Sequence, residues 1–246
     1  MIAWVYPLII LAAIGVGASL LRRSQSTLQL SPHDKWAIGI SAFCGAMLGA
    51  KLPFALSDWE ALRSGTVWFS NGKTILSGLV GAYLAVELTK WIYGIRTKTG
   101  DTFAVPAAVT VSIGRLGCFA AGCCYGTPTD LPWGIQFELA DGAVLPRHPT
   151  QLYESAFHLT VAFMMAGLHR RGIWRGQLMK FYILSYLLYR FATEYIRPEP
   201  ELWWGLTSYQ WFALAIAPVF AFIWWSDLRH DTVNRIAPHS EPASTG

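Results

Sequence analysis

Seven stretches of mostly apolar residues constrain the fold of this chain more than any other feature of its sequence. They cover residues 3–21, 36–56, 74–94, 103–125, 150–169, 177–196 and 207–225. A helix needs roughly 20 apolar residues to cross a bilayer. Hydrophobic residues make up 53% of the chain and charged residues only 14%, whereas a soluble domain is about a quarter charged. The sequence therefore predicts an all-α integral membrane protein with seven transmembrane helices.

The chain is expected to form one transmembrane domain over residues 1–228, followed by a polar tail. The first apolar stretch lacks a basic segment before it and a small-residue cleavage site after it, so it is interpreted as a retained span and not a signal peptide. Residues 229–246 contain Pro, Ser and Thr, and we expect them to be disordered. The net charge of +4 is too small to suggest nucleic acid as a partner.

The distribution of Lys and Arg predicts the orientation of the helices. The loops on one side, together with the tail, hold eleven basic residues, and those on the other side hold four. The eleven are Arg22, Arg23, Lys35, Lys90, Arg96, Lys98, Arg170, Arg171, Arg175, Arg229 and Arg235, and the four are Arg63, Lys73, Arg147 and Arg197. Because cytoplasmic loops are rich in basic residues, the N-terminus is predicted outside and the C-terminus in the cytoplasm.

The fourth and sixth predicted spans carry charges that the orientation brings toward the outer leaflet. Arg115 lies in the fourth span, where a charge costs roughly 2.5–3.5 kcal/mol. It is either a structural ion pair with a carboxylate of another helix or a phosphate ligand, because guanidinium binds phosphate oxygens in pairs. Arg190, Glu194 and Arg197 share one helical face. Arg190 and Glu194 either neutralise each other so that the span can insert, or they provide a second cation for an anionic substrate and a carboxylate that acts as a base.

A third group of polar residues, "PRHPTQLYES" (146–155), precedes and begins the fifth span. Pro149 fits the first turn of a helix, which leaves His148 at the outer aqueous boundary. Gln151, Tyr153 and Glu154 follow in the first turns. The group is either a polar interfacial cap or a site in which His148 accepts a proton.

Small residues and thiols complete the candidate site. Gly114, Gly117, Gly122 and Gly126, like the glycines of the second and third spans, predict close helix packing and a helix break near Cys123 and Gly126. No spaced pair of Cys-x-x-Cys motifs is present, so a structural zinc site is poorly supported and we expect no metal. Adjacent Cys123 and Cys124 should point to different faces of a helix.

Three motifs resemble the prolipoprotein diacylglyceryl transferase family. They are "GRLGCFAAGCCYG" (114–126), "RHPTQLYE" (147–154) and "RFATEYIR" (190–197), and their order and spacing correspond to those of the family over roughly residues 36–225. The resemblance implies an enzyme of the bacterial inner membrane. It would transfer a diacylglyceryl group from phosphatidylglycerol to the lipobox cysteine of a prolipoprotein and release glycerol phosphate, without a cofactor.

The resemblance also implies roles for individual residues. Arg115 would hold the lipid phosphate, with Arg190, Glu194 and Arg197 beside it, and His148, Gln151 and Tyr153 would lie at the outward mouth of the cavity. The expected substrates are phosphatidylglycerol, within the membrane lipid, and a prolipoprotein signal peptide. Fixed positive charge at the phosphate would stabilise the leaving group, and a nearby base would take the thiol proton.

The chain departs from the family pattern around the reacting centre. Cys118 and Cys123 replace an Asn and a Glu of the family motif, Ala121 replaces a second Asn, and Leu76 replaces a His. Lys51 stands where the family has Arg, and keeps the charge without bidentate geometry. Two alternatives therefore stay open: a lipid transferase with another acceptor, in which Cys118 or Cys123 reacts covalently, and a phospholipid-binding membrane protein without catalysis.

Overall fold

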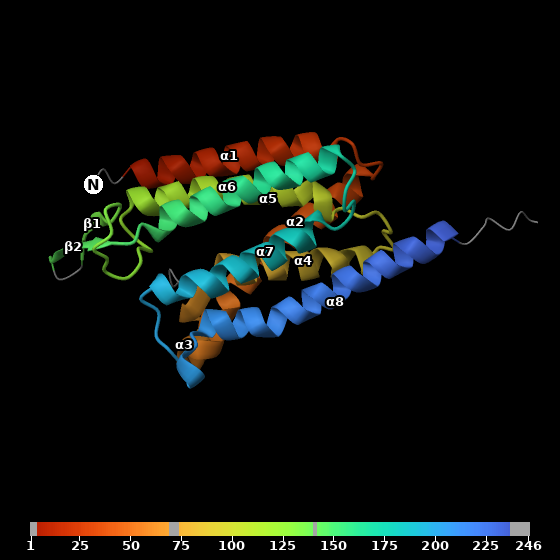
Figure 1. Cartoon of the computed structure of the whole chain (residues 1–246). Helices are drawn as coiled ribbons and strands as arrows, with labels where there is room; N and C mark the ends of the chain where they lie inside the picture. Colours follow the sequence, from red (N-terminus) through yellow and green to blue (C-terminus); the bar gives the residue numbers. More distant parts are fainter. Residues whose placement is uncertain (1–3, 69–73, 140–141, 237–246) are drawn as a thin grey trace, which may run out of the picture.

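The fold, seen in a computed structural model, is a bundle of long helices with a small hairpin at one end (Figure 1). The structure describes residues 4–68, 74–139 and 142–236. The long helices are α1 Val5–Gln25, α2 Pro32–Ser57, α4 Ile75–Ile92, α5 Gly100–Ala120, α6 Thr150–Arg170, α7 Leu178–Thr193 and α8 Ser208–Ile236. The short elements are α3 Trp59–Ser64, η1 Thr66–Trp68, β1 Ile135–Glu138, β2 Val144–Arg147, η2 Glu194–Ile196 and η3 Trp203–Gly205.

Each of the seven predicted apolar stretches overlaps one long helix, but the number of spans is established only in part. Among the described residues, α1, α2, α4, α5 and α8 are long and apolar enough to cross a membrane. Helix α7 has 16 residues, or about 24 Å, and α6 carries several buried polar side chains. The chain is thus a mostly helical, multi-pass membrane protein, and the full count of seven spans stays a prediction.

Two boundaries differ from the sequence expectations. The fourth span was expected to continue to residue 125, but α5 ends at Ala120, and Gly122 follows with φ +67°. Helix α8 runs to Ile236, so the expectation of disorder is wrong for residues 229–236. The rest of the tail, 237–246, and Lys73 lie outside the described residues.

An antiparallel hairpin interrupts the helical pattern between α5 and α6, which an all-α prediction did not include. Its register pairs Ile135 with Arg147 and Glu138 with Val144. The strands have four residues each, too short for a clear alternation of apolar and polar side chains in the sequence. The hairpin leads the chain from the end of α5 to the start of α6.

Glycines allow α2 and α4 to pack with their backbones in contact. A Cβ atom on Gly45 would lie 2.5 Å from the carbonyl oxygen of Gly81, and one on Gly49 would lie 2.4 Å from that of Ser77. Helices in lipid associate through such small residues. The close packing predicted from the glycines of the second and third spans is confirmed.

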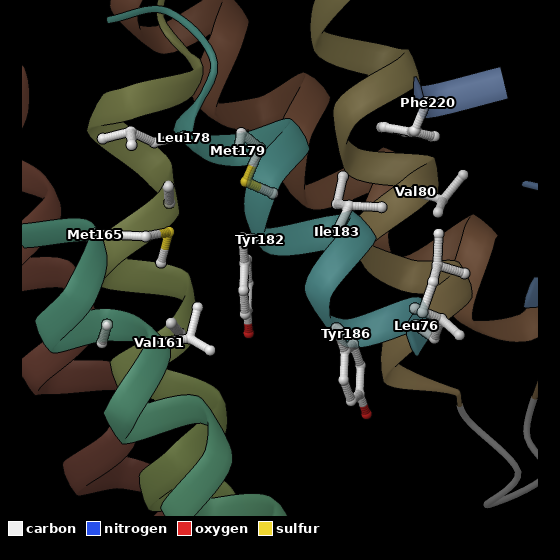
Figure 2. Close-up of a cluster of buried hydrophobic side chains, with 14 of the residues drawn as sticks. Leu76, Val80, Val161, Met165, Leu178, Met179, Tyr182, Ile183, Tyr186 and Phe220 are labelled. Atoms are coloured by element: carbon white, nitrogen blue, oxygen red, sulfur yellow. The ribbon is translucent and has the colours of Figure 1, made fainter. Parts of the chain in front are cut away.

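Helix α7 lies at the centre of the apolar core (Figure 2). Its residues Tyr182, Ile183 and Tyr186 are almost completely buried and pack among residues of α4, α5, α6 and α8, including Leu76, Met165 and Phe220. Large apolar side chains elsewhere are exposed, among them Leu11, Phe43, Leu48, Phe163, Leu188 and Phe222. An apolar exterior of this kind suits contact with lipid.

Candidate functional site

Three segments that are far apart in the sequence meet at the end of the bundle that carries the hairpin (Figure 1). The loop after α5 donates from Gly126 N to the His148 oxygen (2.8 Å) and from Thr127 N to the Ile196 oxygen (2.9 Å). A Cβ atom on Gly126 would lie 2.5 Å from the Ile196 oxygen and 2.8 Å from both His148 Cβ and Thr150 Cγ2. Gly126 is therefore required for this convergence, which joins the three motifs singled out in the sequence.

Arg115 on α5 forms a buried ion pair with Glu154 on α6. Its Nη2 atom lies 2.7 Å from Glu154 Oε1, and both side chains are almost fully buried. The Tyr186 hydroxyl, from α7, donates to the same carboxylate oxygen. Of the two interpretations of Arg115 from the sequence, the ion pair with a carboxylate of another helix is thus present. If Arg115 also binds a phosphate, the phosphate must contact the guanidinium group while Glu154 stays bound to it.

A buried histidine extends the network on α6. His158 Nε2 lies 3.8 Å from Glu154 Oε1, and its Nδ1 atom lies 2.9 Å from the Tyr182 hydroxyl. Sequence reasoning named Glu154 only as a member of the polar group at the start of the fifth span, without a role of its own, and missed His158, Tyr182 and Tyr186. The pairs 154/158 and 182/186 have an i, i+4 spacing, which places polar groups on one face of each helix and could have revealed them.

The motif at the end of α7 supplies two more guanidinium groups. Arg190 Nη2 lies 2.8 Å from Glu194 Oε2, which confirms the pairing predicted along the helix. The Arg190 guanidinium also lies 4.5 Å from the centre of the Tyr209 ring. Arg197 Nη1 lies 3.6 Å from Glu154 Oε2, so it faces the same carboxylate as Arg115.

These five charged groups form one cluster with an excess of positive charge. Arg115, Arg190 and Arg197 contribute three cations, against the two carboxylates of Glu154 and Glu194. Arg190 is also close enough to Glu154 to interact with it electrostatically. Within the described residues, Nε of Arg115, Nη1 of Arg190 and Nε of Arg197 are buried without a hydrogen-bond partner. Glu154 Oε2 and both carboxylate oxygens of Glu194 are likewise buried without a hydrogen-bond partner. Each buried unsatisfied group costs about 1–3 kcal/mol, so the cluster has polar groups left for a ligand to bind.

The start of α6 holds the loop that carries the cysteines. The Gln151 side chain donates to the Cys123 carbonyl, and Thr150 Oγ1 donates to the Cys124 carbonyl over 2.7 Å. Gln151 is fully buried, which corrects its expected position at the outward mouth of a cavity. The thiols of Cys118, Cys123 and Cys124 lie within 4.8 Å of one another.

His148 and Tyr153 lie together at the edge of the site. His148 Nδ1 is 3.4 Å from the Tyr153 hydroxyl, and both side chains are half-buried. Lys51 on α2 is buried, and its ammonium group donates to the Val67 carbonyl over 3.1 Å. A direct role of Lys51 at the phosphate stays a prediction.

The comparisons with known proteins agree with the geometry. A family model described as prolipoprotein diacylglyceryl transferase matches residues 2–226. A phosphatidylglycerol–prolipoprotein diacylglyceryl transferase of Clostridium tetani is 29% identical over 77% of this chain and 79% of its own. An enzyme of the same name from Geobacter sulfurreducens is 35% identical over 70% of this chain and 66% of its own. Another, from Nitratidesulfovibrio vulgaris, is 30% identical over 82% of this chain and 77% of its own. The chain belongs to the prolipoprotein diacylglyceryl transferase family.

Proposed function

We propose that the protein transfers a diacylglyceryl group from phosphatidylglycerol to the cysteine thiol of a prolipoprotein. A thioether forms and glycerol phosphate leaves. Membership of the family supports this activity, since its relatives are named for these two substrates. The location that fits is the inner membrane of a bacterium, where the donor lipid and the signal peptide of the precursor are both present.

The observation that carries the proposal is the excess of guanidinium groups over carboxylates in the buried cluster. Arg115, Arg190 and Arg197 come from two helices and the turn after α7, and each keeps a buried N–H without a partner. A phosphate would accept from these donors and balance the charge. Arginine suits this role because its planar donor group matches phosphate oxygens and stays protonated.

The carboxylates explain how the cluster tolerates burial before the lipid binds. Glu154 and Glu194 neutralise two of the three guanidinium groups at 2.7 and 2.8 Å, which lowers the cost of charges within the membrane. When the phosphate leaves, its developing negative charge lies beside fixed cations, which stabilise the transition state. In this scheme the arginines bind the substrate and hold the leaving group.

The acceptor thiol needs a base, and two groups are candidates. His148, half-buried at the edge of the site, could take the proton directly, with the Tyr153 hydroxyl at 3.4 Å holding the imidazole ring. Glu194 is the alternative, and Arg190 Nη2 lies 2.8 Å from its carboxylate. Gly126 contributes by close packing, and Gln151 by holding the Cys123 carbonyl.

A topology of seven spans would put this chemistry on the outer side of the membrane. The basic loops favour an N-terminus outside and a cytoplasmic C-terminus. The cluster at the end of α5, the start of α6 and the end of α7 would then face the outer leaflet. A precursor that emerges on that side could present its cysteine to the lipid.

The test is a direct assay of transfer. The purified protein is incubated with phosphatidylglycerol and a peptide that contains a lipobox cysteine, and the peptide is analysed by mass spectrometry. We expect the mass of one diacylglyceryl group to be added to the cysteine, and no addition to a peptide with Ser at that position. Binding of phosphatidylglycerol without any adduct would instead favour a lipid-binding protein without catalysis.

A further inference from the structure

Three cysteine thiols lie together next to the arginine cluster. The Sγ atoms of Cys118, Cys123 and Cys124 are all within 4.8 Å of one another, and all three cysteines are free. Cys118 lies in the last turn of α5, and the other two follow the turn at Gly122. Cys123 and Cys124 are exposed, so an ion or a substrate can reach their thiols.

The backbone brings these thiols together against its ordinary preference. Cys124 has φ +62°, a left-handed conformation that residues other than glycine rarely adopt. The helical geometry expected for adjacent cysteines would have separated their side chains. The conformation is held from outside the loop, because Gln151 and Thr150 bind the carbonyl groups of Cys123 and Cys124. The loop is therefore preorganised with its three thiols on one side.

We propose that Cys118, Cys123 and Cys124 bind one Zn²⁺ ion and leave its fourth position open to the acceptor thiol. This inference rests on the proposed function, since it concerns the thiol that receives the lipid. Thiolates bind zinc at about 2.3 Å, so three of them around one tetrahedral ion lie about 3.8 Å apart. The thiols need to close only slightly from their present separation. Zinc sites with three protein ligands and an open position are those that take part in reactions.

The charges around the thiols fit a metal centre. Zinc with three thiolates carries one negative charge, and Arg115 and Arg197 are close enough to Cys124 to interact with it electrostatically. These cations would balance the negative charge of the metal centre. They are also the groups assigned to the lipid phosphate, so the metal-bound acceptor and the donor lipid would meet in one place.

The metal supplies what the exposed acceptor lacks, a thiolate near neutral pH. A thiol that coordinates zinc loses its proton to water or to a nearby base. Its sulfur then attacks the glyceryl carbon, an S–C bond forms, and the C–O bond to the phosphate breaks. The electron pair of that bond leaves with glycerol phosphate, whose charge the arginines hold. No oxidant or reductant is needed.

A hollow lies beside the segment that carries the thiols, on the side of the hairpin. It has a volume of about 750 Å³ and lies between the end of α5, the start of α1 and strand β1. Phe119, Gly122 and Phe137 contribute to its lining, and Gly122 directly precedes Cys123. The position and apolar lining suit a peptide segment that brings a cysteine to the metal.

Metal binding can be measured without the transfer reaction. The full-length protein is purified in detergent under reducing conditions and titrated with Co²⁺, whose thiolate complexes absorb in the near ultraviolet. We expect about one ion per chain, competed by Zn²⁺, and affinity at least about tenfold lower in Cys118→Ser and Cys123→Ser. The exposed Cys44 of α2 provides a matched control, because Cys44→Ser should bind Co²⁺ as the native protein does.

A variant of Cys124 distinguishes a role as metal ligand from a role in the stability of the fold. Cys124→Gly removes the thiol but relieves the left-handed backbone, so the midpoint of thermal unfolding should stay the same or rise while Co²⁺ affinity falls. Native-like Co²⁺ binding by this variant, or by the two Ser variants, would overturn the proposal. Absence of Co²⁺ binding by the reduced native protein would overturn it as well.

The open position is tested with peptides that resemble the acceptor. A cysteine peptide should change the spectrum of the Co²⁺-loaded protein, and the matched serine peptide should not. An unchanged spectrum with both peptides would refute coordination of the acceptor. Lipid transfer by the protein without any bound metal would support the proposed function and disprove the metal site. Metal binding without lipid transfer would support the metal site and disprove the proposed function.

Discussion

Arg115 has two possible roles, to neutralise the buried Glu154 carboxylate and to bind the lipid phosphate. A single substitution of Arg115 would affect both roles at once. Arg115→Gln leaves the buried Glu154 carboxylate without its partner at 2.7 Å. Removing one member of a buried pair destabilises a protein by about 3–5 kcal/mol. Glu154 keeps Arg197 at 3.6 Å and the hydroxyl of Tyr186, so we expect the lower end, about 3 kcal/mol.

The double variant Arg115→Gln/Glu154→Gln removes both charges and leaves two amides that can bond to each other. Most of the lost stability should return, with a coupling energy of about 2–3 kcal/mol. The measurement is unfolding in mixed micelles, followed by tryptophan fluorescence. Lipid transfer should stay absent in the double variant, because the phosphate has lost a guanidinium group.

Two results would refute this reasoning. Transfer at the native rate by the stable double variant would mean that Arg115 only neutralises Glu154. Stability of Arg115→Gln equal to that of the native protein would show that the buried pair does not behave as a coupled unit.

Three further predictions concern packing, the polar network and the orientation. Gly126→Ala should destabilise the protein by about 1–3 kcal/mol, since its Cβ would lie 2.5 Å from a backbone oxygen. Gly114→Ala, with nothing within 4 Å, should be neutral or stabilising in the same unfolding assay. Tyr186→Phe should cost about 1.5–3 kcal/mol, because it removes a hydrogen bond to a charged group, and a smaller loss would argue against that bond. A membrane-impermeant maleimide added from outside should label Cys123 but not Cys44, and the opposite pattern would reverse the predicted topology.

The sequence was sufficient to predict the seven long helices and the meeting of three motifs. The length of an apolar stretch predicts a membrane helix without any knowledge of its neighbours. The alternation of loops rich and poor in basic residues predicted that Arg115, His148 and Arg190 would lie at the same depth of the membrane. The pair Arg190–Glu194 followed from helical spacing alone. These features depend on local sequence or on simple counting.

The features that sequence reasoning missed depend on contacts between helices. Glu154 and Tyr186 reveal their role only when α5, α6 and α7 are side by side, because each binds a partner on another helix. Cys123 and Cys124 were expected on different faces of a helix, but the helix has ended before them, Cys124 has a left-handed backbone, and their thiols lie beside that of Cys118. The spacing of cysteines along the sequence cannot reveal a thiol cluster that depends on a left-handed turn of the backbone.

The central claim is that the arginine cluster holds the phosphate of phosphatidylglycerol while the bond to the glyceryl carbon breaks. Phosphorus NMR of the purified protein with this lipid and a lipobox peptide tests it most directly, because the released glycerol phosphate gives its own signal. We expect this signal to grow with the cysteine peptide and to be absent with the serine peptide or with Arg115→Gln/Glu154→Gln. No release with the cysteine peptide, or equal release by the double variant, would contradict it.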